Sequence, residues 1–404
     1  MKIMMANKYF FWKGGAETVY FQERDFLRSA GVKVVDFSMY DERNEPSDFS
    51  DYFVEQRDYH ASSLGALGKA KVALSMIHSP QAVARIKDLI RKEKPDLLHC
   101  HNIYHQLTPS IIRAAKEMGI RVVLTLHDFK VVCPTYSRIY KGKVCAACEG
   151  GDFYNVVRRR CSEDSLARSA LLYAEATFER FCGNYLRIDR AIAPSRFMAD
   201  VVTRWRFPKE RVTVLYNGVD PNNFQPVPDS GGYALFLGRL IHDKGLLTLA
   251  EAQRGTDIRV VVAGTGPLEE TLRRDYPWLE LVGYQSGDAL RTLVEGASFI
   301  VVPSLVQENC PMAVLEAMAS GKAVIASRNG GIPELVEEGT TGLLFESGNA
   351  DELRLKLQTL GSDTTLQAEM GRAARAKVQR DFSLQKHNES LLRIYESVLT
   401  ERCV

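Results

Sequence analysis

Two glutamates on one short apolar segment are the residues of this sequence best suited to hold a ligand. Glu308 precedes, and Glu316 lies within, a predicted helix over Pro311–Ser320 that is apolar on nearly every side. Pro311 suits the first turn of this helix and Gly321 suits its end. A carboxylate buried there is costly unless it is paired or hydrogen-bonded. The two glutamates therefore either make structural bonds or grip separate hydroxyl-bearing parts of one long ligand.

A pair of cations follows a predicted strand earlier in the chain. Arg239 and Lys244 belong to the sequence GRLIHDKG, and Lys244 lies at the start of the next predicted helix. Because a helix N-terminus has free backbone N–H groups, two cations beside it make a binding site for an anion. An ordinary exposed basic pair is the alternative.

Two glycine turns each join a predicted strand to the helix that follows. Gly14 and Gly15 follow the first strand (FFWKGGAE), and Gly264 and Gly266 follow a later one (AGTGPLEE). Glycine lets the backbone approach a ligand closely, so such turns can present amides to a phosphate. Neither turn completes the pattern G-x-G-x-x-G, and plain tight turns are the alternative.

A histidine follows the predicted strand RVVLTL. His127, with Asp128 after it, lies at the carboxyl end of that strand, where parallel sheets bind ligands. His127 therefore either donates to a sugar hydroxyl or a phosphate, or is satisfied by its neighbour Asp128.

Four of the eight cysteines fall within one loop-like stretch. Cys145 and Cys148 have C-x₂-C spacing, and Cys133 and Cys161 flank them at similar distances. Four thiolates suit a closed tetrahedral zinc site that would order such a loop. The outer spacings match no standard zinc ribbon, so free thiols or a redox pair are the alternatives. A zinc site here would shape a pocket and take no part in chemistry.

The strands and helices that position these residues are predicted from the pattern of apolar and amphipathic segments along the sequence. Short apolar runs alternate with helix-length amphipathic stretches, a pattern typical of βαβ units and parallel sheets. The predicted strands are Lys2–Ala6, Val32–Phe37, Asp96–Cys100, Arg121–Leu126, Arg190–Ala193, Val212–Leu215, Tyr233–Leu237, Ile258–Ala263, Leu279–Val282, Ser298–Val302, Ala323–Ala326 and Gly342–Phe345. In such sheets ligands bind beyond the carboxyl ends of the strands.

Length and composition indicate two domains. With 404 residues and 45% hydrophobic residues, the chain is too long for one compact core. A Pro-, Asn- and Gly-rich stretch at residues 217–230 interrupts the alternation of predicted strands and helices and indicates a linker. We predict an α/β protein of two Rossmann-like, doubly wound parallel-sheet domains, residues 1–216 and 231–384, that face a central cleft.

The net charge of +2 hides an asymmetry. Residues 1–216 hold 34 Lys and Arg against 25 Asp and Glu, whereas the remaining residues hold 18 against 25. A basic half indicates contact with an anionic surface, such as lipid head groups or lipid-linked phosphate. Ordinary solvated faces are the alternative. The basic residues are dispersed and include no DNA-binding motif, which argues against nucleic acid as a partner.

Two sequence features bear on the location of the protein. No run approaches the roughly 18 apolar residues of a membrane span, and Met1–Ala6 is too short for the core of a signal peptide. We expect a cytoplasmic protein with peripheral contact to the membrane through its basic first half.

A series of motifs follows in one order along nearly the whole chain. They are GGAE at Gly14–Glu17, NGVD at Asn217–Asp220, GRLIHDKG at Gly238–Gly245, AGTGPLEE at Ala263–Glu270, PSLVQENCPMAVLEAMASGKAVIAS at Pro303–Ser327 and GGIPELV at Gly330–Val336. Together they resemble the retaining glycosyltransferases of family four, which have the GT-B fold of two Rossmann-like domains. The resemblance implies that the final helix, about residues 385–404, packs back on the first domain.

The resemblance also implies a role for each candidate residue. Glu316 would bind the nucleotide ribose, and Glu308 would approach hydroxyls of the transferred sugar. Arg239 and Lys244 would clamp the diphosphate, and His127 would line the reaction centre. Further nucleotide-sugar contacts would come from Gly15, Gly264, Gly266, Asn309, Cys310, Pro311 and Met312. Many family members carry an aromatic or glycine pair in place of Asn309-Cys310, which leaves the favoured sugar open.

The implied activity is transfer of a sugar from a UDP- or GDP-sugar to a glycan or lipid-linked acceptor in surface polysaccharide biosynthesis. The first half would hold the acceptor and the second the donor, with retention of the anomeric configuration. Fixed cations would stabilise the leaving diphosphate, so no metal ion would be required for catalysis. A sugar-nucleotide 2-epimerase of related fold and a non-catalytic sugar-nucleotide-binding scaffold are the alternatives.

Overall fold

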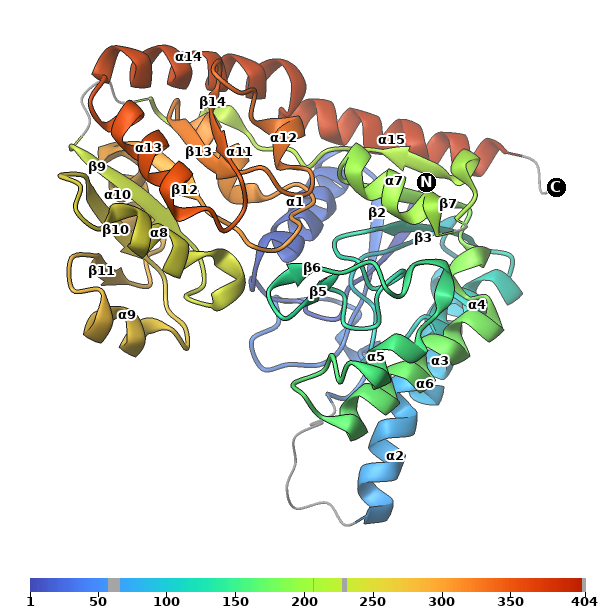
Figure 1. The fold of residues 1–404 in the computed structure, drawn as a ribbon. Helices are drawn as coiled ribbons and strands as arrows, with labels where there is room; N and C mark the ends of the chain where they lie inside the picture. Colours follow the sequence, from blue (N-terminus) through green and yellow to red (C-terminus); the bar gives the residue numbers. More distant parts are fainter. Residues whose placement is uncertain (57–65, 206, 227–230, 402–404) are drawn as a thin grey trace.

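Two parallel six-stranded β-sheets form the core of the protein (Figure 1). The computed structural model describes residues 1–56, 66–205, 207–226 and 231–401. The first sheet has the strand order β2-β1-β3-β4-β7-β8, and the second has the order β11-β10-β9-β12-β13-β14. The predicted α/β fold with two doubly wound parallel sheets is confirmed.

The strands begin and end at most one residue from their predicted bounds. The first sheet consists of β1 (Lys2–Ala6), β2 (Lys33–Phe37), β3 (Leu97–Cys100), β4 (Arg121–Thr125), β7 (Arg190–Ala193) and β8 (Val212–Val214). The second consists of β9 (Tyr233–Leu237), β10 (Arg259–Ala263), β11 (Glu280–Gly283), β12 (Ala297–Val302), β13 (Ala323–Ser327) and β14 (Gly342–Phe345). A two-stranded hairpin, β5 (Ile139–Tyr140) and β6 (Lys143–Val144), lies outside both sheets.

Helices connect the strands, and their bounds follow in chain order. They are α1 (Gly15–Ser29), α2 (Ala66–Ile77), α3 (Pro80–Glu93), α4 (Ser110–Glu117), α5 (Tyr154–Arg158), α6 (Leu166–Cys182), α7 (Arg196–Arg204), α8 (Leu246–Gln253), α9 (Glu269–Asp275), α10 (Gly287–Gly296), α11 (Met312–Ala319), α12 (Ile332–Leu335), α13 (Ala350–Gly361), α14 (Thr364–Asp381) and α15 (Leu384–Thr400). Within the described ranges, no helix combines the length and the apolar character needed to cross a membrane.

Both faces of each sheet are buried, which explains why the strands are nearly continuous apolar runs. In β1, Met4 and Ala6 pack in one apolar cluster with residues of α3 and α4, whereas Ile3 and Met5 pack on the opposite face with α1. The second sheet is covered in the same way, by α11 and α14 on one face and by α8 and α13 on the other.

The last helix crosses from the second half to the first (Figure 1). Val219 pairs with Ser383 in an isolated β-bridge just before α15 begins. Leu391, Tyr395 and Val398 of α15 then pack in the same cluster as Ile3 of β1. Helix α15 thus covers the first sheet together with α1.

Candidate active site

The strand order of each sheet identifies where its ligand-binding loops lie. In the second sheet β9 is flanked by β10 and β12, so the winding direction reverses between β9 and β12. Open α/β sheets bind ligands at such a point, beyond the carboxyl ends of the strands. Arg239 follows β9, and Glu308 follows β12. The first sheet reverses between β1 and β3, and the loop after β1 leads to Gly15.

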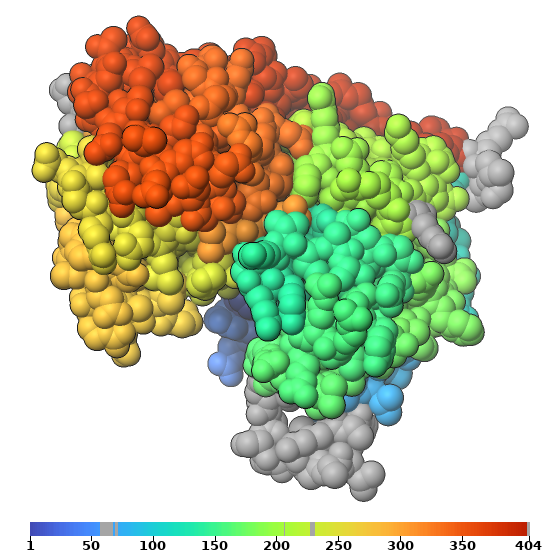
Figure 2. All heavy atoms as spheres, viewed as in Figure 1, coloured from blue at the N-terminus to red at the C-terminus, as the bar shows by residue number. Residues whose placement is uncertain are grey.

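A cleft with a volume of about 540 Å³ is lined by loops of both halves. In Figure 2 the surface is hollowed between the part coloured yellow and the part coloured green, and dark-blue residues from early in the sequence are visible between them. The predicted site residues that line this cleft are Gly15, His127, Arg239, Lys244, Glu308, Asn309, Cys310, Pro311 and Met312. The structure therefore brings together candidates that are up to about 300 residues apart in sequence.

Lys244 and Glu308 form an ion pair in this cleft. The Lys244 Nζ and Glu308 Oε1 atoms are 2.6 Å apart, and the hydroxyl of Ser304 donates to the same oxygen over 2.8 Å. Gly245, between Lys244 and α8, has a φ of 74°, and a Cβ there would lie 1.8 Å from the carbonyl oxygen of Pro303. Only glycine lets the two loops approach so closely, and this approach places the cation against the carboxylate.

Arg239 supplies a second cation to the cleft. Its side chain is exposed and makes no ion pair or hydrogen bond with any residue of the described ranges. Burial raises the pKa of the Tyr136 phenol, and Arg239 is near enough for its charge to oppose that shift. Tyr136 belongs to the first half. Because no described residue occupies the donors of Arg239, they are available for a ligand in the cleft.

Two helix N-termini meet at the cleft. Gly15 is the first residue of α1 and Met312 the first residue of α11, and a Cβ on Gly15 would lie 3.5 Å from the Met312 Cγ. The free N–H groups at the start of a helix favour an anionic ligand. Their dipoles add to the charges of Arg239 and Lys244.

His127 is paired with another histidine and not with its neighbour Asp128. The His127 Nε2 and His101 Nδ1 atoms are 2.8 Å apart, and the two rings are stacked. Asp128 instead accepts hydrogen bonds from the Tyr104 hydroxyl and the backbone N–H of Lys130. Burial and the nearby His101 lower the pKa of His127 to about 3. His127 is therefore neutral at pH 7 and can exchange hydrogen bonds without carrying charge.

The polar groups behind His127 form a fully buried network. Glu23 Oε1 lies 3.1 Å from His387 Nε2 of α15, and Glu23 Oε2 lies 3.4 Å from His101 Nε2. Tyr395 and Thr125 bond the two ring nitrogens of His99 over 2.7 and 2.8 Å. The ligand atoms of Glu23, His99 and His101 lie within 4.8 Å of one another. Since both His99 nitrogens are already bonded, we interpret the cluster as a hydrogen-bond network that orients His127.

Glu316 lies one turn along α11 from the cleft. It is partly buried beside the cleft-lining Ala313, three residues earlier and so on the same face of the helix. Burial raises the pKa of its carboxyl group, and no described residue pairs or bonds with it. An unpartnered carboxylate in this position is free to accept hydrogen bonds from ligand hydroxyls.

Gly264 and Gly266 lie beneath the cleft and do not line it. A Cβ on Gly264 would come within 1.9 Å of the Gly238 carbonyl oxygen, and one on Gly266 within 2.5 Å of the Leu240 carbonyl oxygen. The backbone N–H of Leu240 also donates to Thr265 over 2.9 Å. These glycines therefore support the loop that carries Arg239, a role that the sequence did not indicate.

Two lysines of the cleft were not among the predicted residues. Lys8 follows β1 and lies 4.1 Å from the centre of the Tyr104 ring, and Lys13 lies 3.6 Å from the centre of the Tyr9 ring. Burial lowers the pKa of Lys8 to about 8. The position of Lys8 just beyond a strand's carboxyl end is the signal that identifies it.

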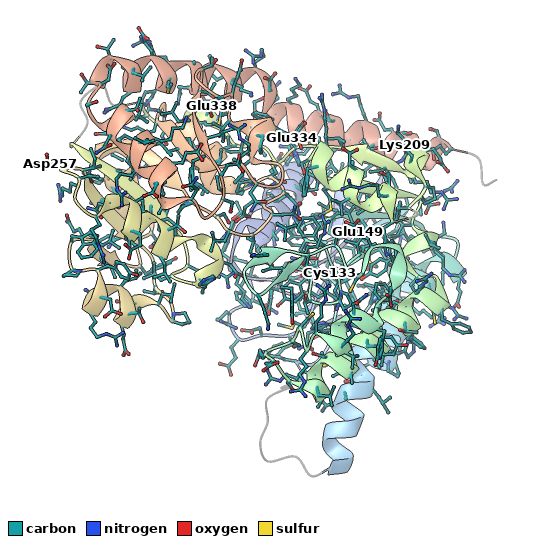
Figure 3. The ribbon with its side chains drawn as sticks, in the orientation of Figure 1. Cys133, Glu149, Lys209, Asp257, Glu334 and Glu338 are labelled. Carbon is teal, nitrogen blue, oxygen red and sulfur yellow. The ribbon has the colours of Figure 1, made fainter. Side chains whose placement is uncertain are left out.

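Three side chains connect the second half to the first half and to the linker beside the cleft. The Asn309 amide donates to the His127 carbonyl over 2.9 Å, and the Asn217 amide donates to the Cys310 carbonyl over 2.8 Å. Glu334 accepts from the backbone N–H groups of Arg196 and Phe197, both over 2.8 Å, and so caps α7. Figure 3 shows Glu334 where the second half, in orange, meets α7, in green.

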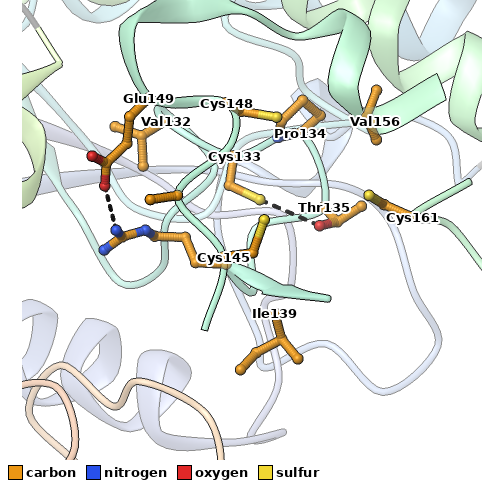
Figure 4. A pocket seen from close by; sticks show the side chains of 12 residues that line it. Val132, Cys133, Pro134, Thr135, Ile139, Cys145, Cys148, Glu149, Val156 and Cys161 are labelled. Carbon is orange, nitrogen blue, oxygen red and sulfur yellow. Dashed lines mark hydrogen bonds and ion pairs between the residues drawn. The ribbon is translucent and has the colours of Figure 1, made fainter. Parts of the chain in front are cut away.

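The four cysteines lie around a separate, small cavity of about 20 Å³ that shares no residue with the cleft (Figure 4). All four line this cavity, but no three of their sulfur atoms lie within 4.8 Å of one another. The structure thus gathers the predicted zinc ligands without the spacing of a closed metal site.

Two protein-family models match the chain. The model described as Glycosyltransferase Family 4 matches residues 13–223, which is more than half of the 404 residues. The chain belongs to glycosyltransferase family 4. A second model, described as Glycosyl transferases group 1, matches residues 222–377 of this family-4 glycosyltransferase. The resemblance inferred from the motifs is confirmed.

Individual proteins agree with this assignment. Sulfoquinovosyl transferase SQD2 of Arabidopsis thaliana is 26% identical over 325 residues, which are 77% of this chain and 58% of that protein. Amylovoran biosynthesis glycosyltransferase AmsK of Erwinia amylovora is 30% identical over 201 residues, which are 44% of this chain and 48% of that protein. This family-4 glycosyltransferase thus spans about half the length of the curated relatives it matches.

A solved structure shows the same fold. The crystal structure of Anabaena Alr3699/HepE in complex with UDP and glucose matches with a TM-score of 0.69 and 18% sequence identity, over 98% of this chain and 100% of that one. The likeness confirms the GT-B fold for this family-4 glycosyltransferase.

Proposed function

We propose that this family-4 enzyme is a retaining glycosyltransferase that moves a sugar from a UDP- or GDP-sugar to a glycan or lipid-linked acceptor in surface polysaccharide biosynthesis. The observation that carries the proposal is the placement of Arg239, Lys244 and Glu308 in one cleft, opposite His127. The name of AmsK, a relative in amylovoran biosynthesis, supports the polysaccharide assignment. The UDP and glucose bound by a structural neighbour support a UDP-sugar as donor.

The charges of the cleft suit departure of a nucleoside diphosphate. As the bond between the sugar and the phosphate breaks, negative charge develops on the diphosphate. Arg239, Lys244 and the N-termini of α1 and α11 stabilise that charge in place of a metal ion. Glu308, which Lys244 holds at 2.6 Å, then contacts hydroxyls of the transferred sugar.

The acceptor completes the reaction on the same face of the sugar. The leaving phosphate accepts the proton of the incoming hydroxyl, so the step needs no protein nucleophile. In this arrangement the first half, residues 1–216, holds the acceptor, and the second half, residues 231–384, holds the donor. The basic first half meets an anionic, membrane-associated acceptor.

A mass-spectrometric screen of UDP-, GDP-, ADP- and dTDP-sugars tests the proposal. We expect one donor class to be turned over, by transfer or by slow hydrolysis, with release of the nucleoside diphosphate. Turnover should persist when EDTA is added, because the cations of the clamp belong to the protein. Donor binding without turnover across a broad acceptor panel would instead favour the non-catalytic scaffold. Immediate inactivation by EDTA that Mg²⁺ reverses would contradict the metal-free clamp.

A further inference from the structure

Four cysteines far from the reacting groups surround one small cavity. Cys133 precedes the hairpin β5–β6, Cys145 and Cys148 follow it, and Cys161 follows α5. All four are free thiols in the structure, and none is fully exposed. Figure 4 shows them around the cavity, with the Cys133 sulfur 3.3 Å from the Thr135 hydroxyl. Four sulfur ligands favour zinc over magnesium or calcium, which prefer oxygen ligands.

The surroundings of the cavity carry positive charge. The Arg159 guanidinium donates to the Cys145 sulfur over 3.2 Å, and the buried Arg138 also lines the cavity. Glu149, the acidic residue of the cavity wall, is already paired with Arg138. A zinc ion with four thiolates has a net charge of −2, so a guanidinium that bonds a sulfur is the kind of outer partner such a site requires.

The segment that carries the four cysteines contains many strained backbone conformations. Six of the nine non-glycine residues with positive φ in the described ranges lie between residues 136 and 164; they are Tyr136, Arg138, Lys141, Arg160, Glu163 and Asp164. A non-glycine residue in such a conformation persists only where its surroundings hold it. The regular structure between Cys133 and Cys161 is limited to the two-residue strands β5 and β6, one turn of 3-10 helix and the five-residue helix α5. A cross-link between the four sulfurs would supply the missing restraint.

We propose that Cys133, Cys145, Cys148 and Cys161 bind one structural Zn²⁺ ion as thiolates and that this ion holds one wall of the cleft. Zinc–sulfur bonds of about 2.3 Å require neighbouring sulfurs to lie roughly 3.8 Å apart. Binding therefore draws the four side chains together into the cavity and releases the protons of the thiols.

The bound zinc ion would affect the cleft through Tyr136. Its backbone N–H donates to the Cys133 carbonyl over 2.8 Å, and its ring stacks on Tyr104 with 6.0 Å between ring centres. Tyr104 in turn bonds Asp128, which lines the cleft. The zinc ion thus restrains the turn that carries Tyr136, and this turn contacts the cleft through Tyr104 and Asp128.

Metal content of the full-length protein tests the proposal directly and requires no activity. Elemental analysis of protein produced with added zinc and purified without chelators should find about one zinc ion per chain. Cobalt-substituted protein should show the intense visible bands of tetrahedral cobalt thiolate. Wild-type protein free of zinc with all thiols reduced, or a disulfide among the four cysteines in mass spectra of unreduced protein, would overturn the proposal.

Variants assign the zinc to this cavity. Cys148→Ser should lose the bound zinc, whereas Cys182→Ser, which changes a partly buried cysteine outside the cavity, should retain it. Should Cys148→Ser fail to fold, thiol titration of the wild-type protein replaces it: a strong chelator should expose four additional reactive thiols. Retention of zinc in folded Cys148→Ser, or no change in thiol count with chelator, would place the metal elsewhere and refute the site.

Discussion

At the scale of single residues, the candidate site contains both paired and unpartnered charged groups. Lys244 and Glu308 neutralise each other across 2.6 Å. Arg239 and Glu316 have no bonding partner among the described residues. A nucleotide sugar offers a phosphate to the cation and hydroxyls to the carboxylate, so donor binding would satisfy both groups at once.

We expect the Glu316 carboxylate to contribute more to ligand affinity than to the stability of the free protein. We expect Glu316→Gln to weaken affinity for the nucleoside diphosphate of the donor about tenfold or more, because hydrogen bonds to a charged group are lost. Stability of the free protein should stay the same or rise, since the buried group has no partner to lose. Calorimetric titration and urea unfolding measure the two quantities. Glu270→Gln on the exposed face of α9 is the matched control, and equal affinities of the two variants would refute the assignment.

Lys8 should make binding of the diphosphate depend on pH. Burial lowers the pKa of Lys8 from 10.5 to about 8, so the side chain loses its charge as the pH rises through about 8. Affinity for the nucleoside diphosphate should therefore be constant below this pH and fall above it. Lys8→Met should bind more weakly with no such fall, whereas the exposed Lys33→Met should behave as wild type. A wild-type affinity that does not change across this pH would contradict the account.

At the scale of elements, the contact between α12 and α7 joins the two halves. The Glu334 carboxylate caps α7 through two backbone N–H groups and accepts a third hydrogen bond from the Tyr216 hydroxyl over 2.7 Å. A carboxylate at a helix N-terminus also interacts favourably with the helix dipole. This cap therefore fixes how the second half approaches the first beside Asn309.

Removal of this cap should destabilise the protein. Glu334→Ala should lower the free energy of unfolding by about 1–2 kcal/mol, the usual cost of losing a helix cap. Urea unfolding followed by circular dichroism measures the change. Glu337→Ala removes an exposed glutamate of the same segment and should change little. A Glu334→Ala protein as stable as Glu337→Ala would show that the contact contributes nothing.

The sequence predicted the strands well because buried parallel strands are continuous apolar runs. The same rule fails for β5 and β6, whose two-residue strands carry no such signal. The predicted ends of the strands identified Arg239, Lys244 and Glu308 as site candidates. They give no information about contacts between residues that are far apart in the sequence. The pairing of His127 with His101, the Glu334 cap and the support given by Gly264 all depend on packing that only the folded chain defines.

At the scale of the whole molecule, α15 connects the second half to His127 of the cleft through Glu23. Its residues His387 and Tyr395 enter the buried network that ends at His127. Burial opposes ionisation of Glu23, but hydrogen bonds from His101 and His387 hold its pKa well below the usual range. The helix thus contributes both apolar packing and polar bonds to the first half.

The network should make stability depend on Glu23. Loss of a buried hydrogen bond to a charged group costs about 1.5–3 kcal/mol, so Glu23→Gln should unfold at a lower urea concentration than the exposed Glu42→Gln. Because the folded pKa is depressed, the stabilisation is present above the unfolded value of about 4.5 and is lost as the pH falls below it. Glu23→Gln should lack this loss. If both variants unfold at the same urea concentration at neutral pH, the Glu23 network does not stabilise the folded protein.

The most direct test of the clamp is the rate at which the enzyme releases a nucleoside diphosphate from its donor, compared between wild type and Lys244→Met. Removal of one preorganised charge at the leaving group should lower this rate about 10²- to 10³-fold. Lys356→Met, which removes a lysine paired with Glu338 outside the cleft, should leave it unchanged. A Lys244→Met protein that folds normally and turns over its donor at the wild-type rate would contradict the proposed function.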